Sequence, residues 1–240
     1  MRNNGRENNE LRKIDFHLNY TKNAEASVLA IFGDTKVLCN VTIESGVPRW
    51  MRKKGHGWIT AEYGMLPRST NTRNIRESSK GKQSGRTHEI QRLIGRSMRG
   101  TTNLAALGER TITIDCDVIQ ADGGTRTAAI SGAYLALKIG INELMVKNKI
   151  DIDPLPRYLG AISVGIFEGV PILDLDYHED SHAETDMNII MDDDANFIEI
   201  QGTAESKAFN KFELEKMLEL ADKGVKEIIE IQRNLFNKYI

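Results

Sequence analysis

Apolar residues, many of them β-branched, gather in four short stretches of the first half of the chain, and this pattern predicts β-strands. The four stretches are 27–32, 36–43, 58–63 and 111–119. Gly33-Asp34-Thr35 separates the first two, so we expect a hairpin there. The third lies within 48–85, a polar stretch of little periodicity that otherwise predicts loop. The fourth alternates, and its polar face carries Asp115 and Asp117.

Two further stretches of the first half predict helices. Residues 88–104 have apolar side chains three or four positions apart, which indicates an amphipathic helix. Its apolar positions are Ile90, Leu93, Ile94 and Met98, and its other faces carry Arg92, Arg96 and Arg99. Residues 128–146 are mostly apolar, which predicts a buried helix.

The second half follows the same order of strands and then helix. Its predicted strands are 160–167, 170–175, 186–191 and 197–201, and its helical residues are 207–237. Pro154 and Pro156 mark a boundary, so we expect one half over 1–150 and another over 156–240. The pattern predicts an α+β fold in which helices pack on mixed sheets.

The composition is that of an ordinary globular protein. With 240 residues, of which 40% are hydrophobic and 28% charged, the chain can bury a core without disulfides or metals. Cys39 and Cys116 are too few for a disulfide framework and indicate a reducing compartment. Residues 1–13 are polar, unlike a signal peptide, and no apolar run approaches the length that crosses a bilayer. We therefore expect a cytoplasmic protein that does not engage membranes.

Charge is divided unevenly along the chain. Residues 1–110 contain 20 Lys and Arg against 10 Asp and Glu, whereas 111–240 contain 12 against 24. Within this, 49–99 holds 13 basic and 3 acidic residues, and 168–199 holds 11 acidic residues and no Lys or Arg. Such asymmetry indicates either a surface that binds polyanions or two halves that attract each other.

A glycine-rich turn between a strand and a helix, Gly123-Gly124-Thr125-Arg126, is the first candidate anion site. Glycine lets the backbone approach a ligand closely, and the first N–H groups of a helix attract anions. Arg126 adds a planar donor suited to phosphate. A plain strand-to-helix turn has the same pattern, so the pattern alone leaves both interpretations open. A second cationic loop, 81–87, lacks the spacing of a nucleotide P-loop but could contact phosphate.

The acidic half offers Asp180 and Asp186 as candidate metal ligands. Clustered carboxylates repel one another unless they are solvated, protonated or bridged by a cation, and oxygen ligands suit Mg²⁺ or Mn²⁺. An acidic turn exposed to solvent is the alternative. The same segment contains His178-Glu179-Asp180-Ser181-His182, the spacing of a zinc protease motif. That motif requires a helix, and the surrounding turn-prone residues predict none.

Several blocks of sequence, taken together and in order, resemble the ribonuclease PH family. They are residues 57–68, Ser84-Gly85-Arg86-Thr87 with 89–96, 115–118, 121–126, and 179–181 leading to Asp186-Met187-Asn188. The resemblance extends from about Gly5 to the final helix. It implies two related halves of the ribosomal protein S5 domain 2-like type and a homohexameric ring assembled as a trimer of dimers.

The resemblance also implies an activity and a set of site residues. Ribonuclease PH proteins are phosphate-dependent 3′→5′ exoribonucleases that trim tRNA precursors and other RNA 3′ ends, releasing nucleoside diphosphates. Inorganic phosphate is then the co-substrate, and Mg²⁺ or Mn²⁺ the metal. The residues implied for phosphate are Arg86, Gly124, Thr125 and Arg126, and those implied for metal and catalysis are Asp180 and Asp186.

The arginines of the basic region are expected to contact RNA or neighbouring subunits. They are Arg68, Arg73, Arg76, Arg92, Arg96 and Arg99. Two other functions stay open at this point. One is a noncatalytic RNA-binding ring subunit, and the other a zinc metalloprotease that uses His178 and His182. Whether Asp115 and Asp117 join the metal site is also open.

Overall fold

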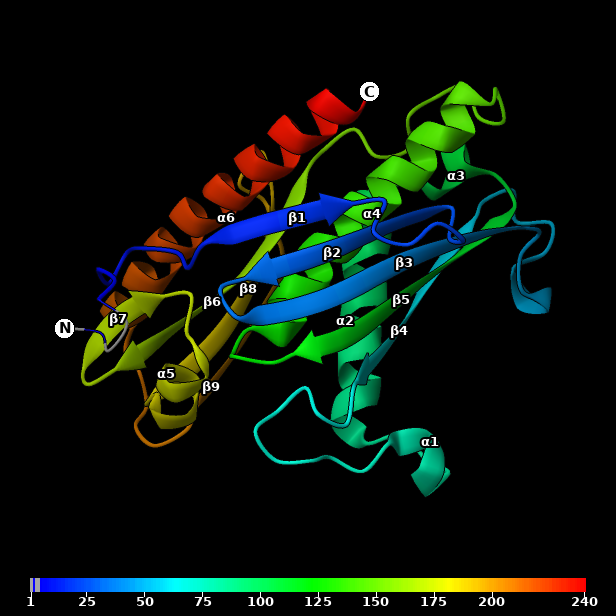
Figure 1. Cartoon of the computed structure of the whole chain (residues 1–240). Coiled ribbons are helices and arrows are strands. Elements are labelled where there is room, and N and C mark those ends of the chain that lie inside the picture. The colour runs from blue at the N-terminus through cyan, green and yellow to red at the C-terminus, as the bar shows by residue number, and fades with distance from the viewer. Residues whose placement is uncertain (1, 3–4) are drawn as a thin grey trace.

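A five-stranded sheet forms the first half of the molecule (Figure 1). The structure is a computed structural model that describes Arg2 and residues 5–240. The strands are β1 (Ile14–Leu18), β2 (Ala26–Phe32), β3 (Thr35–Ser45), β4 (Trp58–Met65) and β5 (Arg110–Gln120). They lie in the order β1-β2-β3-β5-β4, and only β4 and β5 pair in parallel. The parallel pair makes this a mixed sheet.

A four-stranded antiparallel sheet forms the second half. Its strands are β6 (Leu159–Phe167), β7 (Val170–Leu173), β8 (Thr185–Asp192) and β9 (Phe197–Ala204), in the order β7-β6-β8-β9. All residues of β6 except the last are buried, because elements pack against both of its faces.

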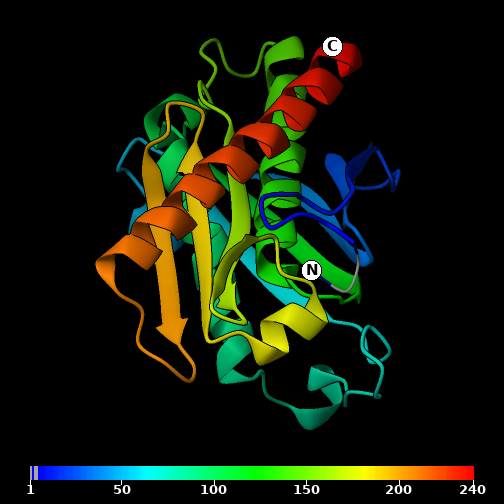
Figure 2. The same cartoon turned by 90° about the vertical axis from the view of Figure 1, so that its left-hand side faces the viewer.

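Three long helices cover the sheets. They are α2 (Gly85–Thr101), α4 (Thr125–Val146) and α6 (Lys211–Tyr239). The short helical segments are η1 (Arg49–Met51), α1 (Glu77–Lys80), α3 (Leu104–Leu107) and α5 (Tyr177–His182). α2 and α4 lie behind the first sheet in Figure 1, and α6 crosses the second sheet in Figure 2.

The central helix α4 joins the two halves. It packs on β2 and β3 of the first sheet and on β6 of the second, so the apolar core is continuous between them. By length and composition α4 is apolar enough to cross a membrane, which the sequence analysis does not anticipate. However, 78% of its most apolar window is buried inside the protein, as in the core helix of a globular domain.

The predicted α+β fold is confirmed, and every predicted strand is present. The second sheet is antiparallel throughout, whereas both sheets were expected to be mixed. Helices α2 and α4 each begin three residues earlier than predicted, because Ser84 and Gly124 act as their N-caps. The first strand, β1, is absent from the prediction although Ile14, Phe16 and Leu18 alternate with polar residues.

Candidate active site

The N-termini of α2 and α4 each place an arginine at the second helical position. Ser84 caps α2 by accepting a hydrogen bond from the Thr87 N–H at 3.1 Å, and Arg86 follows in the first turn. Gly124 is the N-cap of α4, and Arg126 takes the equivalent position. Helix N-termini carry partial positive charge, so each arginine adds to a potential that already favours anions.

The start of α4 is fixed by two glycines that no other residue can readily replace. Gly123 and Gly124 have φ angles of 74° and 62°, in the left-handed region. A Cβ on Gly123 would lie 2.6 Å from the carbonyl oxygen of Leu175, so the turn packs directly against the backbone before α5. The Thr35 hydroxyl donates to the Gly123 carbonyl at 2.7 Å and accepts from the Asp122 N–H at 2.8 Å.

The guanidinium of Arg126 is held in place by hydrogen bonds to polar side chains from both halves of the molecule. Its Nη1 donates to Gln201 Oε1 at 2.9 Å and lies 3.4 Å from Glu89 Oε1. Gln201 Nε2 donates to the same Glu89 oxygen at 2.7 Å. Glu89 lies on α2 and Gln201 on β9, so the guanidinium is oriented by a neighbouring helix and by the opposite sheet. Arg86, by contrast, is exposed.

Thr125 is the first residue of α4, and its side chain is buried. The hydroxyl of Tyr63, on β4, donates to Thr125 Oγ1 at 3.0 Å. Burial raises the pKa of Tyr63, and the hydrogen bond with Thr125 and the nearby Arg86 and Arg126 partly oppose this shift. Tyr63 is therefore within electrostatic reach of both site arginines.

Asp180 and Asp186 approach the arginines from the second half. Asp180 is on α5 and Asp186 on β8, where it pairs with Gly165 of β6. Burial raises the pKa of Asp180, while Arg126 and Arg86 act in the opposite direction. Burial also raises the pKa of Asp186 to about 6; the charge of Asp180 adds to the shift and Arg126 opposes it. The two carboxylates and the two arginines thus share one site.

The two carboxylates fit a hard divalent cation. The pKa of each is raised because burial disfavours the ionised form, and the charge of Asp180 further disfavours ionisation of Asp186. A bound cation would therefore stabilise the ionised forms of both. No group of three or more His, Cys, Asp or Glu suited to a metal occurs in the described part of the chain. Mg²⁺ retains several waters and binds through one or two carboxylates plus substrate phosphates, which matches this donor set.

An N-terminal segment of arginines anchors the acidic half of the site. Arg2 donates to both Glu179 oxygens at 2.6 Å, and Arg6 lies 3.2 Å from one of them. Arg12 donates from Nη2 and Nε to the two Asp174 oxygens at 2.7 and 3.0 Å. Burial alone would raise the pKa of Asp174, but Arg12 and Arg6 lower it overall. In Figures 1 and 2 the N-terminal segment lies beside β7 and α5.

The expectation that the zinc-like motif is not helical is wrong. Asp176 accepts from the Glu179 N–H at 2.9 Å in a capping box, and α5 follows. The His178 and His182 rings do stack, with centroids 4.7 Å apart. Glu179, however, is buried in its ion pair with Arg2, so it cannot act as the general base that such a protease requires. The structure gives no support to a zinc protease.

The three loop arginines Arg68, Arg73 and Arg76 are exposed. They lie in the segment before α1 that extends from the lower edge of the molecule in Figure 1. The Arg76 carbonyl accepts from the N–H groups of Ser79 and Lys80 at the start of α1, but none of the three side chains has a hydrogen bond or ion pair within the described residues. Their side chains are therefore available to a neighbouring subunit or to RNA.

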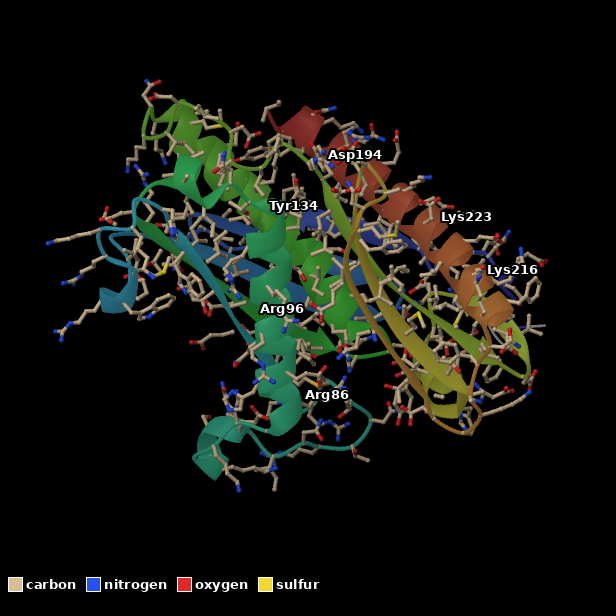
Figure 3. All side chains as sticks on the ribbon, turned by 180° about the vertical axis from the view of Figure 1, so that it is seen from behind. Arg86, Arg96, Tyr134, Asp194, Lys216 and Lys223 are labelled. Atoms are coloured by element: carbon tan, nitrogen blue, oxygen red, sulfur yellow. The ribbon has the colours of Figure 1, made fainter. Side chains whose placement is uncertain are left out.

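The helix arginines differ from one another. Arg92 is exposed, and Arg96, seen midway along α2 in Figure 3, pairs with Glu199 of β9 at 3.2 Å. Arg99 donates to the Ile59 carbonyl at 2.7 Å, and its guanidinium lies 4.4 Å from the Trp58 ring centroid. Arg99 thus has a packing role within its own half.

Asp115 and Asp117 lie beside a third acid, Glu62 of the adjacent strand β4. Burial raises the pKa of both, Glu62 adds to each shift, and Asp117 adds to that of Asp115. Neither Asp180 nor Asp186 contributes to these shifts. On β5 the intervening Cys116 faces Ala129 of α4, so strand alternation puts Asp115 and Asp117 on the opposite face of the sheet from the helix that carries Arg126.

Several residues of the site escape the sequence patterns. Tyr63 has a local signal, because a polar-ended side chain falls on the buried face of a strand with Ile59 and Ala61. Gln201 and Arg12 have none, because Gln201 meets Arg126 across 75 positions and Arg12 meets Asp174 across 162 positions of the chain.

Two family comparisons decide the relationship of the chain. Residues 10–140 match domain 1 of the 3′ exoribonuclease family (RNase PH), and residues 158–224 match its domain 2. The chain belongs to this family. The resemblance inferred from the ordered sequence blocks is therefore confirmed, together with the two-domain fold that it implies.

Solved structures share the fold at low sequence identity. Rice (Oryza sativa) Rrp46 superposes with a TM-score of 0.78 at 20% identity, covering 97% of this chain and 98% of that one. A chain of the Archaeoglobus fulgidus exosome with RNA bound to the active site gives 0.78 at 21%, covering 100% and 92%. An archaeal exosome core chain gives 0.76 at 19%, covering 96% and 90%. These likenesses establish the fold.

Proposed function

We propose that this protein is a phosphate-dependent 3′→5′ exoribonuclease that trims the 3′ ends of tRNA precursors and other RNAs. The observation that carries the proposal is the meeting of Arg86 and Arg126 with Asp180 and Asp186 in one site. Family membership supports exoribonuclease chemistry, and the juxtaposition supports phosphate as the attacking group.

The reaction brings anions together, and the site residues are matched to that difficulty. An oxygen of hydrogen phosphate attacks the phosphorus of the last phosphodiester, and the bond from phosphorus to the 3′ oxygen breaks. The released nucleoside carries two phosphates, and the proton of hydrogen phosphate balances the one gained by the leaving oxygen. Arg86, Arg126 and the backbone at Gly124 and Thr125 would hold the attacking ion in line and screen its charge.

The carboxylates of Asp180 and Asp186 would act on the scissile phosphate of the RNA. Asp180 and Asp186 would hold Mg²⁺ or Mn²⁺, which supplies positive charge to the scissile phosphate and the leaving oxygen. Glu89 and Gln201 keep the Arg126 guanidinium at the junction between the two halves of the site. The chain contributes mainly position and electrostatics, as expected for phosphoryl transfer.

A second candidate function, a noncatalytic RNA-binding ring subunit, is favoured by the solved relatives. The structures that superpose on this chain are Rrp46 and chains of exosome cores, one with RNA bound to the active site. On that interpretation the chain would assemble into a ring and contact RNA without cleaving it. A homohexamer built as a trimer of dimers is the assembly we propose for either function.

Product identity separates the two functions. The purified protein is incubated with a tRNA bearing a 3′ extension and Mg²⁺, with and without inorganic phosphate. Nucleoside diphosphates formed only when phosphate is present support the exoribonuclease. RNA that is bound but not shortened under all conditions would refute catalysis and favour the ring subunit. Asp180→Asn with Asp186→Asn serves as the control for a contaminating nuclease.

A further inference from the structure

Tyr63 places a polar group at the buried end of an otherwise apolar strand face. Along β4 the buried positions are Ile59, Ala61 and Tyr63, and Tyr63 is only 4% exposed. A buried phenol hydroxyl normally requires a hydrogen-bond partner. Phenylalanine would pack equally well here without that requirement, so the hydroxyl calls for an explanation.

The partner is a residue of the phosphate site. Tyr63 donates its hydroxyl hydrogen to Thr125 Oγ1 at 3.0 Å. Burial raises the pKa of Tyr63, so the phenol remains a donor at neutral pH. The bond joins β4 directly to the first residue of α4, beside Arg126.

This bond determines what the Thr125 hydroxyl can do. A threonine hydroxyl has one hydrogen to donate and two lone pairs that accept. Tyr63 occupies an acceptor position, which leaves the hydrogen of Thr125 available for donation. Within residues 2 and 5–240, that hydrogen has no protein acceptor. An anion at the α4 N-terminus would supply one.

We propose that Tyr63 is a positioning residue that orients the Thr125 hydroxyl as a donor to the attacking phosphate. The inference rests on the proposed phosphate site and deepens it. Tyr63 does not touch the phosphate itself but fixes the direction of the hydroxyl that does. The edge strand of the first sheet thereby becomes part of the phosphate site.

Tyr63→Phe is the most direct test, because it removes one oxygen and keeps the ring. We expect KM for phosphate to rise about three- to tenfold, the effect of losing one hydrogen bond between neutral groups, with kcat little changed. Equilibrium binding of inorganic phosphate, followed by ³¹P NMR, should weaken by a similar factor. Thr125→Val should weaken it at least as much.

Tyr134→Phe is the matched control. Tyr134 is a fully buried tyrosine of α4 whose hydroxyl donates to the Arg157 carbonyl at 2.6 Å. Figure 3 shows it well away from Arg86. Its loss should cost stability comparable to that of Tyr63→Phe while leaving phosphate affinity unchanged. Equal effects of both variants on phosphate would mean that Tyr63 is merely structural.

A double variant completes the test. If Tyr63 acts through Thr125, Tyr63→Phe adds no further loss of phosphate affinity in a Thr125→Val background. Independent, additive losses would overturn the proposal, as would an unchanged phosphate affinity in Tyr63→Phe. Failure of the proposed function is recognised separately, because the wild-type protein itself would then release no nucleoside diphosphates and bind no phosphate.

Discussion

Arg86 and Arg126 occupy the same place in two different helices, the second residue after the N-cap. Their surroundings nevertheless differ. Arg126 is braced by Glu89 and Gln201, whereas Arg86 is exposed. A braced guanidinium loses less freedom when an anion binds, so Arg126 is the preorganised member of the pair and Arg86 is the one that must become ordered.

The first prediction concerns these two arginines. Arg86→Ala and Arg126→Ala should each raise KM for phosphate by about tenfold or more, because a charge-assisted contact is worth roughly 1.5–3 kcal/mol. Initial rates at varied phosphate concentration measure the effect. Arg52 is exposed and directly follows η1, and Arg52→Ala is the control. Its KM for phosphate should match that of the wild type. Unchanged phosphate dependence in both site variants would remove them from the site.

The second prediction concerns the acidic pair. The pKa of Asp186 is raised to about 6, so the folded state holds this proton more firmly than the unfolded chain does. The free energy of unfolding therefore falls as pH rises from about 4 to about 6, and above that range this loss of stability does not increase further. Asp186→Asn should abolish activity yet stabilise the metal-free protein by up to about 3 kcal/mol at pH 7.5, and by almost nothing below pH 4.

Urea unfolding in the presence of EDTA at the two pH values tests this directly. Asp151→Asn, an exposed acid outside the site, is the control and should change stability little at either pH. Destabilisation by Asp186→Asn at pH 7.5 would contradict the raised pKa. Retained RNA trimming in the same variant would exclude Asp186 from the proposed catalytic role.

At the scale of elements, α5 is short but strongly held. Among its six residues Glu179 is buried and the following Asp180 is half-buried. Glu179 is fixed by Arg2 and Arg6, and the preceding Asp174 by Arg12. A helix of this length has little intrinsic stability, so the ion pairs with the N-terminal segment determine where Asp180 lies.

Glu179→Gln is the third prediction. It removes the charge that pairs with the buried Arg2 guanidinium, which should destabilise the protein by about 3 kcal/mol, whereas Arg6 keeps its ion pair with Asp174. Activity should fall as well, because Asp180 is the next residue. Glu168→Gln, an exposed position in the same acidic stretch, should alter neither quantity. Thermal unfolding and trimming rates measured on both variants check this, and a Glu179→Gln protein as stable as wild type would contradict it.

The elements show how far sequence patterns reach. β3 is predictable because its residues alternate between buried and less buried positions, and β2 because it is a short, almost wholly buried apolar run. The start of α4 is not, because Gly124 caps it without a side chain. Helix α5 has a local signal in the capping box of Asp176 and Glu179, which was overlooked among turn-prone residues, and its anchors Arg2 and Arg6 lie more than 170 positions away. Local patterns made the turn at Arg126 and the Asp180–Asp186 pair candidates and the family resemblance assigned their roles, whereas Tyr63 and Gln201 required the fold.

For the whole molecule, the uneven charge has two separate outcomes. Part of the basic excess is satisfied internally, as in the contact of Arg96 with Glu199. The side chains of the loop arginines Arg68, Arg73 and Arg76 remain exposed and have no hydrogen bond or ion pair within the described residues. Attraction between the halves therefore accounts for only part of the basic charge, and the surface for polyanions stays a prediction for the exposed loop.

The fourth prediction follows from that exposed loop. Replacing Arg68, Arg73 and Arg76 together with Ala should give smaller oligomers and weaker tRNA binding, with the fold of the subunit intact. Light scattering reports the mass, and filter binding reports the affinity for tRNA. The control is a variant that loses the same charge on α6, where we expect no effect on assembly. It replaces Lys211, Lys223 and Lys238 with Ala. A wild-type mass for the arginine variant would exclude the loop from subunit contacts.

The N-terminal arginine segment also has a consequence for synthesis on the ribosome. Arg12 is made 162 residues before its partner Asp174, and Arg2 is made 177 residues before Glu179. At about 5–20 residues per second, the carboxylates that pair with these arginines are made roughly 8–35 seconds later. The first sheet can form during that interval, but the N-terminal segment of the chain still lacks the carboxylates with which it forms ion pairs. The acidic half therefore cannot reach its final structure until late in synthesis. Until then, the partly translated protein carries an N-terminal segment whose arginines attract anions and are not yet neutralised by Asp174 and Glu179.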